Sequence, residues 1–277
     1  YDARVDDARL VISLVRTAVH HGARAASRVK VTRVLTDLTG RASGAEVVDL
    51  ETGEEFTIRA RHVTNATGVW TEQTQDLAGG TGGLKVLASK GIHVVLPRER
   101  IRGTSGMFLR TEKSVLFIIP WGEYWIIGTT DTDWQLDLAH PAATGADIDY
   151  ILGHVNAVLT EPIGRQDVRG VYAGLRPLLS GSADSTTKLS REHAVMTVAP
   201  GAVVVAGGKY TTYRVMAADA VDAAVAELGQ RAESVPPSTT ERIPLLGADG
   251  YPAMVNRVER IADNYEIREE QVVRLLG

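Results

Sequence analysis

The most distinctive string of residues that could perform chemistry is a glycine-rich turn. An apolar run ends there and a polar helix start follows, with Gly207, Gly208, Lys209, Thr211 and Thr212 in order. Glycine lets the backbone approach a ligand closely. A helix that begins at Thr211 or Thr212 would present free N–H groups and about half a positive charge to an anion. The string fits an ordinary strand-to-helix turn with a threonine cap equally well.

A histidine on an alternating strand is the second candidate. His93 stands between Ile92 and Val94, which face the other way in an extended chain. Histidine changes its charge near neutral pH and can therefore act as a general base. A single histidine on a strand is more commonly a hydrogen-bonded packing residue, so this position needs support from its surroundings.

Two arginines stand next to predicted strands, Arg176 in the string GLRPL and Arg191 in the string SREH. If they converge, they suit a phosphate dianion, which accepts paired hydrogen bonds. Taken alone, each is more simply a surface ion-pair partner. The string GTTDTD at 128–133 could line a pocket mouth or form a plain turn. Its two carboxylates lack further ligands, so no metal site is predicted.

The elements that must position these residues follow from hydrophobic periodicity and turn residues. Thr144 is a predicted helix N-cap, with Asp147 in the first turn. The predicted helices span 7–18, 145–159, 212–228, 254–264 and 268–276. The predicted strands span 25–35, 45–50, 55–60, 61–65, 92–96, 115–119, 124–128, 168–173, 193–198 and 202–206.

Composition narrows the class of protein. The 277 residues are 44% hydrophobic and 23% charged, which is typical of one large or two small globular domains. The sequence contains no cysteine, which excludes disulfides, thiolate catalysis and cysteine-ligated metals. Thirty basic and 34 acidic residues are interspersed, so we expect no nucleic-acid partner. No apolar stretch is long enough to cross a membrane, although a peripheral membrane contact remains open.

Together the strings follow the order found in one family. They read NATGVW, SKGIHVVLP, RTEKSVLFIIPW, IGTTDTDW, YAGLRPLL, SREHAV and AGGKYTTYRVMAADA. The chain resembles the FAD-dependent glycerol-3-phosphate dehydrogenases, respiratory enzymes of the D-amino-acid-oxidase-like flavoprotein superfamily. The resemblance covers residues 1–228, and its most specific strings are GTTDTD and GGKYTTYR.

One departure from the family pattern is large. The family begins with a G-x-G-x-x-G turn that holds the diphosphate of FAD, and this sequence contains no such string. We therefore expect an internal fragment of a longer enzyme. By this interpretation the chain alone holds no FAD and is inactive.

The resemblance implies an α+β fold. It consists of a mixed, largely antiparallel sheet of the substrate domain, part of a Rossmann-like FAD-binding domain, and the start of a helical C-terminal domain. The partial FAD-binding domain would comprise about 1–83 and 200–230, with the substrate-binding domain inserted at about 84–199. Residues 231–240 would form a linker, and 241–277 would begin the helical domain.

The resemblance also implies roles for individual residues. His93 is the candidate base, with Lys209 as the alternative base or as the group that polarises the alkoxide. Arg176 and Arg191 would bind the substrate phosphate. The residues implied to lie beside FAD are Ala66, Thr67 and Gly68 at its adenosine–diphosphate part, and Gly207, Gly208, Thr211 and Thr212 at the isoalloxazine ring.

The activity implied is FAD-dependent oxidation of sn-glycerol 3-phosphate to dihydroxyacetone phosphate, with electrons passed to a quinone. The expected location is cytoplasmic, peripheral on the inner face of the membrane. One alternative is a glycerol-3-phosphate oxidase that returns electrons to oxygen. Another is a non-catalytic module that binds a phosphate ligand, against which the presence of His93, Arg176, Arg191 and Lys209 argues.

Overall fold

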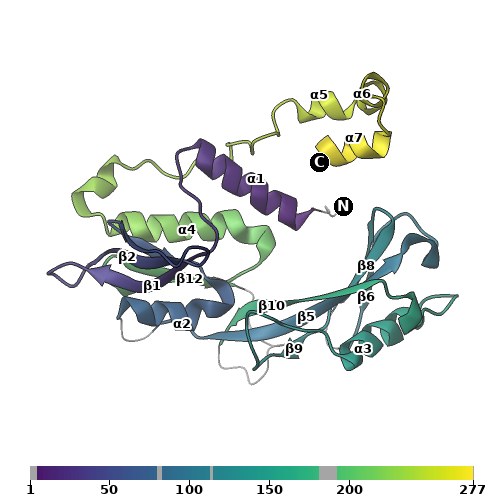
Figure 1. Ribbon diagram of the computed structural model, residues 1–277, viewed down its shortest axis with the longest axis horizontal. Coiled ribbons are helices and arrows are strands. Elements are labelled where there is room, and N and C mark those ends of the chain that lie inside the picture. The colour runs from purple at the N-terminus through teal and green to yellow at the C-terminus, as the bar shows by residue number, and fades with distance from the viewer. Residues whose placement is uncertain (1–4, 80–82, 113–114, 181–191, 277) are drawn as a thin grey trace. The chain divides into compact units, whose positions relative to one another are not determined.

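The computed structural model describes residues 5–79, 83–112, 115–180 and 192–276. Its contacts divide the chain into two units, each described by itself below (Figure 1). The smaller comprises Tyr1–Val29, Asp49–Thr52 and Pro237–Gly277, and the larger comprises Lys30–Val48 and Gly53–Pro236. Helices combine with largely antiparallel sheets, so the predicted α+β class is confirmed.

The smaller unit is helical. Its helices are α1 (Asp7–His20), α5 (Tyr251–Val255), α6 (Val258–Tyr265) and α7 (Glu269–Leu276). The Asp6 side chain caps α1 by accepting a hydrogen bond from the Arg9 N–H. Near the other end of α1, the Thr17 hydroxyl accepts from the backbone N–H of Leu246 at 3.0 Å. The predicted helix at 7–18 is confirmed, with two further residues.

The single helix predicted over 254–264 is wrong, because the chain forms two helices separated at Asn256 and Arg257. The Asn256 side-chain amide donates to the carbonyl of Pro252 at 2.9 Å. That carbonyl is the one to which the Asn256 backbone N–H would bond in a continuing helix. A side chain thus replaces the backbone donor, and α5 ends there.

The larger unit contains three sheets. The first has the strand order β1-β2-β3, with β1 at Val29–Thr36, β2 at Ala42–Asp49 and β3 at Glu55–Arg59. The strands predicted over 45–50 and 55–60 are present as β2 and β3, which pair antiparallel as a hairpin. Gly44 permits the close approach of these strands, because a Cβ there would lie 2.1 Å from the Ile58 carbonyl oxygen.

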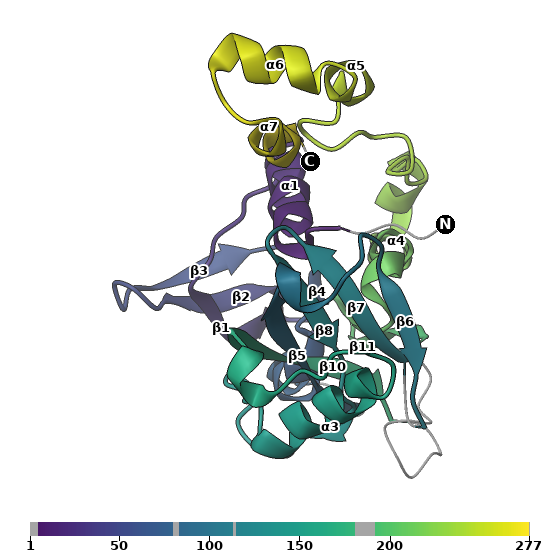
Figure 2. The ribbon, with the colours of Figure 1, turned by 90° about the vertical axis from the view of Figure 1, so that its right-hand side faces the viewer.

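The second sheet is antiparallel and has the order β10-β5-β8-β7-β6, with β9 also paired to β5. Its strands are β5 (Val86–Pro97), β6 (Met107–Arg110), β7 (Val115–Trp121), β8 (Tyr124–Gly128), β9 (Thr132–Asp133) and β10 (Gly170–Leu179). Helix α3 (Gly145–Asn156) packs against β5 (Figure 2). The core between helix and sheet contains Ile92, Val94, Leu96, Trp125, Ile127, Ile151 and Val155.

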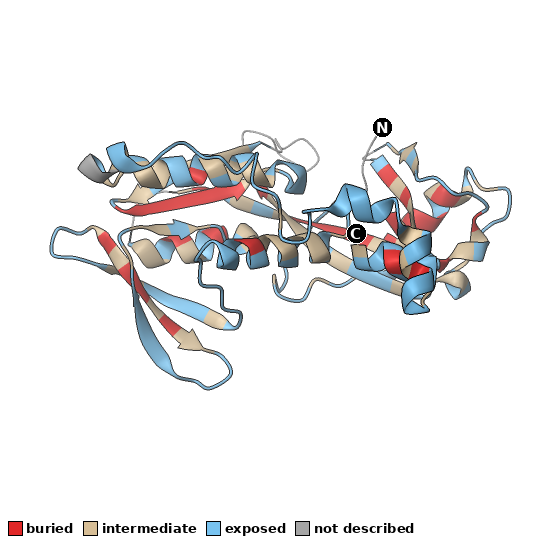
Figure 3. Cartoon of the chain, turned by 90° about the horizontal axis from the view of Figure 1, so that it is seen from above, coloured by how far each residue is buried: buried red, intermediate tan, exposed pale blue. Residues whose placement is uncertain are grey.

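The third sheet has the order β11-β12-β4. Strand β12 (Ala202–Gly207) is antiparallel to β11 (His193–Ala199) and parallel to β4 (Val63–Asn65). Residues 202–206 of β12 are all buried, as expected for an apolar strand inside a sheet. Helix α4 (Tyr213–Ala226) packs against this strand. Figure 3 shows that buried residues lie mainly within strands and helices, whereas the connecting loops are largely exposed.

Several short elements were not predicted from the sequence patterns. Besides β6 and β9 these are helix α2 (Thr71–Gln75) and the 3₁₀ turns η1 (Gly68–Trp70), η2 (Asp76–Ala78), η3 (Arg98–Arg100), η4 (Arg165–Asp167), η6 (Tyr210–Thr212) and η7 (Gly229–Ser234). The strand predicted over 168–173 in fact continues to Leu179. Pro177 lies within this strand, and β10 is at the edge of its sheet, where a missing N–H is tolerated. Arg176 therefore lies inside a strand.

A buried ion pair joins α3 to β5. The Lys90 ammonium lies 2.6 Å from the Asp147 carboxylate, and both side chains are more than nine-tenths buried. The same carboxylate accepts from the backbone N–H and the hydroxyl of Thr144, which completes the predicted N-cap as a capping box. Burial acts to raise the pKa of Asp147, but the hydrogen bonds from Lys90 and Thr144 outweigh it and the pKa is lowered.

Replacing Lys90 with methionine should strongly destabilise the larger unit, because Asp147 would remain buried without its cation. The expected loss of unfolding free energy is about 3–5 kcal/mol, measured by urea denaturation. Arg102 offers the control, since its pair with Glu161 is largely exposed and Arg102→Ala should change stability little. Similar losses in the two variants would contradict a structural role for the buried pair.

Candidate active site

His93 and Arg176 lie on the same face of the second sheet. Directly opposed residues of antiparallel strands share a face, and Tyr172 opposes His93 while Arg176 opposes Ser89. Since side chains alternate along a strand, His93 and Ser89 also point to one side. Ile92 and Val94 point to the other side, into the core, as the sequence predicted.

A strip without side chains separates these two residues. Gly91 and Gly174 oppose each other directly, midway between the His93–Tyr172 and Ser89–Arg176 pairs. A Cβ on Gly174 would meet no atom within 4 Å. A Cβ on Gly91 would lie 2.5 Å from Nη2 of Arg176, so the guanidinium passes directly over this glycine.

The His93 ring is held by its neighbours on both adjoining strands. It stacks on the Tyr172 ring of β10 with centroids 4.8 Å apart and planes 12° from parallel. On the β8 side it lies over Gly128, where a Cβ would come within 2.2 Å of the ring carbon Cδ2. The ring plane is therefore set by one aromatic contact and one glycine.

Arg176 is half-buried and bonds to the segment that follows β8. Its Nη2 donates to the Thr129 hydroxyl at 3.0 Å, and its Nη1 donates to the Thr130 carbonyl at 3.2 Å. Sequence reasoning did not assign Thr129 or Thr130 to the site. The string GTTDTD was the available signal, and it left open whether these residues form a plain turn.

The residues expected beside the cofactor come directly after two strands of the third sheet, at the carboxyl ends of those strands. Strands β4 and β12 are parallel, with Asn65 opposite Val204, so their carboxyl ends coincide. Ala66, Thr67 and Gly68 follow β4 at this edge, and the Gly207–Gly208 turn ends β12 beside them. Crevices at the carboxyl ends of parallel strands are where such sheets bind ligands.

The turn after β4 is ordered by Asn65. Its side-chain oxygen accepts from the Thr67 N–H and hydroxyl, at 3.1 and 2.7 Å, and its amide donates to the Thr74 hydroxyl. Gly68 has a φ of +59°, and its Cβ position lies 4.0 Å from Cγ of Pro177. The turn therefore reaches the strand that carries Arg176.

The turn after β12 requires glycine at two positions. Gly207 and Gly208 have φ values of +78° and +77°, which L side chains rarely adopt. A Cβ on Gly207 would lie 2.9 Å from the Leu179 side chain, and one on Gly208 would lie 2.4 Å from the Met216 sulfur. This turn thus packs on the end of β10 and on α4.

The helix after this turn begins later than the sequence predicted. A 3₁₀ turn over Tyr210–Thr212 precedes α4, which starts at Tyr213 and not at Thr211 or Thr212. Lys209, Thr211 and Thr212 are exposed there, and the Thr212 hydroxyl donates to the Lys209 carbonyl at 3.0 Å. The Gly208 N–H donates to the Glu192 carbonyl and the Lys209 N–H to the Thr212 hydroxyl, so these backbone groups hold the turn itself together.

The structure thus gathers the predicted residues into two groups. His93 and Arg176 share the face of β5 and β10, whereas the turn residues near Gly68 and Gly207 share the sheet edge. Strand β10 joins the groups, since Pro177 adjoins Gly68 and Leu179 adjoins Gly207. Lys209 lies outside the sheet, and Arg191 lies outside the described residues. Within the described ranges, no group of three or more His, Asp or Glu side chains could hold a metal ion.

Comparison with known proteins identifies a family. A family model described as "FAD dependent oxidoreductase" matches residues 1–228. "Glycerol-3-phosphate dehydrogenase 2" of Mycobacterium tuberculosis is 56% identical over 276 residues, which is 100% of this chain and 46% of that protein. Human "Glycerol-3-phosphate dehydrogenase, mitochondrial" is 37% identical, over 81% of this chain and 32% of that protein. The chain therefore spans less than half of the length of these relatives.

A solved structure shares the fold. The glycerol-3-phosphate dehydrogenase from Bacillus halodurans complexed with FAD superposes with a TM-score of 0.84 and is 31% identical. The match covers 98% of this chain and 53% of that one. The resemblance inferred from the sequence strings is confirmed by these comparisons.

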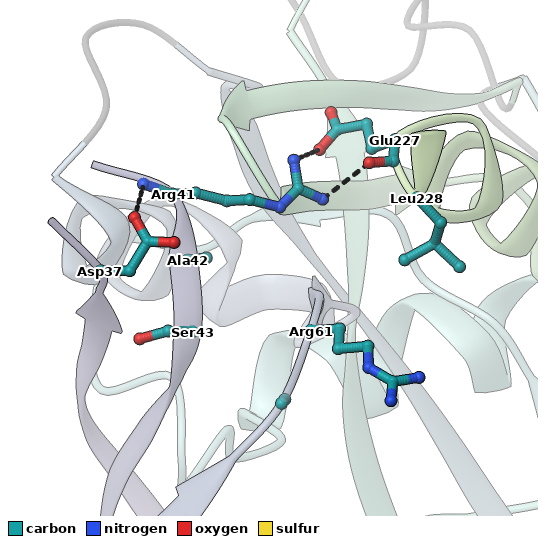
Figure 4. Close-up of a pocket in the computed structure, with 8 residues that line it drawn as sticks. Asp37, Arg41, Ala42, Ser43, Arg61, Glu227 and Leu228 are labelled. Carbon is teal, nitrogen blue, oxygen red and sulfur yellow. Dashed lines mark hydrogen bonds and ion pairs between the residues drawn. The ribbon is translucent and has the colours of Figure 1, made fainter. Parts of the chain in front are cut away.

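A pocket of about 330 Å³ lies at the opposite end of β4 and β12, where these strands begin (Figure 4). Its lining residues are Asp37, Arg41, Ala42, Ser43, Ala60, Arg61, Glu227 and Leu228. The Arg41 guanidinium donates to the Glu227 carbonyl at 2.9 Å and lies 3.7 Å from the Glu227 carboxylate. That carboxylate also accepts from the Gly201 N–H. These contacts fasten the first sheet to the end of α4.

His62 adjoins this ion pair in a buried position. Its side chain is 10% exposed, and its Nε2 lies 3.8 Å from the Glu227 carboxylate without a hydrogen-bond partner among the described atoms. Burial lowers the pKa of His62, although the Glu227 charge acts in the opposite direction. The fold therefore favours the neutral imidazole.

The stability of the larger unit should consequently depend on pH through His62. The unfolded chain binds the proton more readily than the folded one, so the contribution of neutral His62 is present above pH about 6.5 and is lost as the pH falls. Unfolding free energy measured between pH 7.5 and 5.0 should fall less in His62→Gln than in the unmodified chain. The difference cannot exceed about 1.4 kcal/mol per pH unit for one proton. Identical pH profiles would contradict this assignment.

Proposed function

The chain belongs to the family of FAD-dependent oxidoreductases, and we propose that the complete protein oxidises sn-glycerol 3-phosphate to dihydroxyacetone phosphate. The observation that carries the proposal is the shared face of β5 and β10. A candidate base and a candidate phosphate ligand, His93 and Arg176, lie there on either side of a glycine strip. Similarity to proteins named glycerol-3-phosphate dehydrogenase supports the same substrate.

Arg176 binds the phosphate end of the substrate in this proposal. A guanidinium presents its donors in a flat fork that matches two phosphate oxygens. The contacts with Thr129 and Thr130 orient that fork over Gly91. Arg191 is proposed as the second phosphate ligand from the sequence pattern.

His93 accepts the proton of the substrate C2 hydroxyl, and the C2–O bond becomes a carbonyl as hydride leaves C2. Bound FAD supplies the two-electron acceptor for that hydride. A fixed ring plane matters for this step, because proton transfer requires the acceptor nitrogen within hydrogen-bond reach of the hydroxyl. Lys209, in the turn before α4, is the alternative base or polarises the alkoxide.

The cofactor-side residues are proposed to act through their backbone. The segment Ala66, Thr67 and Gly68 would pass the adenosine–diphosphate part of FAD. The exposed turn with Gly207, Gly208, Thr211 and Thr212 would lie beside the isoalloxazine ring. The N-terminal end of α4, which follows this turn, favours negative charge in its vicinity.

A quinone is the proposed electron acceptor, at the cytoplasmic side of a membrane. None of the helices among the described residues is long and apolar enough to cross a bilayer. The acceptor is tested by comparing turnover with a soluble quinone and with oxygen in the complete protein. Peroxide produced at the rate of substrate oxidation would favour the oxidase instead.

Substitutions at the two ends of the glycine strip should have different kinetic effects in the complete, FAD-loaded protein. Arg176→Lys loses the fork, so KM for glycerol 3-phosphate should rise about tenfold or more. His93→Gln removes the base, so kcat should fall by about 10²–10⁴. Steady-state oxidation and anaerobic bleaching of the flavin measure both effects. Arg102→Ala, at an exposed pair, is the control, and an unchanged KM in Arg176→Lys would refute the phosphate role.

The 277-residue chain by itself is proposed to hold no FAD. The diphosphate-binding glycine turn of dinucleotide folds is missing from the sequence. Losing about three charge-assisted hydrogen bonds weakens binding by roughly 4.5–9 kcal/mol, which is several orders of magnitude. An absorption spectrum of the purified chain, mixed with FAD and then desalted, tests this. Stoichiometric retained flavin would overturn it.

A further inference from the structure

The guanidinium of Arg176 is oriented by its neighbours. Its two terminal nitrogens donate to adjacent residues, Nη2 to the Thr129 hydroxyl at 3.0 Å and Nη1 to the Thr130 carbonyl at 3.2 Å. Because a guanidinium is flat and rigid, two such contacts define its plane. One of the two acceptors is a side chain, so it can be removed by substitution without altering the backbone.

The Thr129 hydroxyl is itself oriented. It donates its own proton to the Thr130 carbonyl at 3.2 Å, which leaves its lone pairs to accept from Arg176. A hydroxyl has one proton to give, so this arrangement sets its role as acceptor. Valine has nearly the same shape as threonine but cannot accept a hydrogen bond.

The segment that carries Thr129 is fastened to β5. The backbone N–H of Ile92 donates to the Thr130 hydroxyl at 3.1 Å, and the fully buried Ser89 hydroxyl donates to the Asp131 carboxylate. Thr130 is 4% exposed. The segment with Thr129 is therefore held against β5, the strand that carries His93.

The contact between Thr129 and Arg176 occupies the space above Gly91. A Cβ on Gly91 would lie 2.5 Å from Nη2 of Arg176 and 2.5 Å from the Thr129 hydroxyl oxygen. Both polar atoms thus crowd the position where a side chain would begin. Glycine at this position is required for the contact to form.

We propose that Thr129 is a positioning residue, which holds the Arg176 guanidinium in the plane that receives the substrate phosphate. This inference rests on the proposed function. Without the Thr129 hydroxyl, the Arg176 guanidinium retains its charge but can adopt additional orientations. Substrate binding must then restrict the guanidinium to one orientation, which costs binding free energy. Removing the hydroxyl therefore lowers the affinity for the phosphate group and leaves the rate of the chemical step unchanged.

The test compares Thr129→Val, which lacks the acceptor, with Thr129→Ser, which keeps it, in the complete FAD-loaded protein. Thr129→Val should raise KM for glycerol 3-phosphate about tenfold, the effect of one hydrogen bond to a charged group, with kcat within about twofold. Inorganic phosphate, used as a competitive inhibitor, should weaken by the same factor. Thr129→Ser should leave the KM and the inhibition constant of phosphate close to those of the unmodified protein.

A double-substitution cycle separates positioning from general damage. If Thr129 acts through Arg176, Thr129→Val should add little to the KM of Arg176→Lys. Full additivity, an unchanged KM in Thr129→Val, or a fall in kcat alone would overturn the proposal. Flavin content and melting temperature check folding, and Thr129→Ala replaces the valine variant if that one does not fold.

The two proposals fail differently. If Arg176→Lys leaves KM and phosphate inhibition unchanged, the proposed function of Arg176 fails. If Arg176→Lys raises KM and weakens phosphate inhibition but Thr129→Val changes neither, only the positioning role of Thr129 fails.

Discussion

The larger unit depends on the alternation of side chains along one strand, β5. Ile92, Val94 and Leu96 fill the core beneath α3, so the residues between them must face the other way. A slip of one residue would place His93 in the core and expose Ile92. Burial of the apolar set, together with the Lys90–Asp147 pair to α3, opposes such a slip. The same physical force that builds the core therefore presents the candidate base on the opposite face.

Glycine shapes that opposite face by leaving space. Gly128 admits the His93 ring, and Gly91 admits the Arg176 guanidinium, each at distances that no Cβ would permit. Gly174 keeps the strip between them open. Glycine is normally unfavourable inside strands because it packs nothing. Here the unoccupied volume is what allows two polar side chains, and a ligand between them, to lie on a sheet surface.

Strand β10 connects the two halves of the candidate site. It opposes His93 and Ser89 through its register with β5, and beyond Arg176 it contacts both cofactor-side turns, through Pro177 and Leu179. Its edge position tolerates a proline that an interior strand would not. One strand thus carries a phosphate ligand and defines its distance from the turns at the end of the third sheet. The pocket with the Arg41–Glu227 ion pair lies at the other end of that sheet. This ion pair attaches the first sheet to the end of α4.

The sequence by itself determined the local elements and their faces. Apolar periodicity predicted α1 and α3, and periodicity with turn residues predicted the strands at 45–50 and 55–60. The Thr144 cap was correct, and alternation placed His93 on the face opposite to Ile92 and Val94. Local patterns carry this information because helix and strand periods are properties of neighbouring residues. Only the tertiary structure decided the extension of β10 past Pro177, the opposition of Gly91 to Gly174, and the contact of Arg176 with Thr129, 47 residues away. These features follow from strand order and register, which depend on how distant segments pack and which no local pattern specifies.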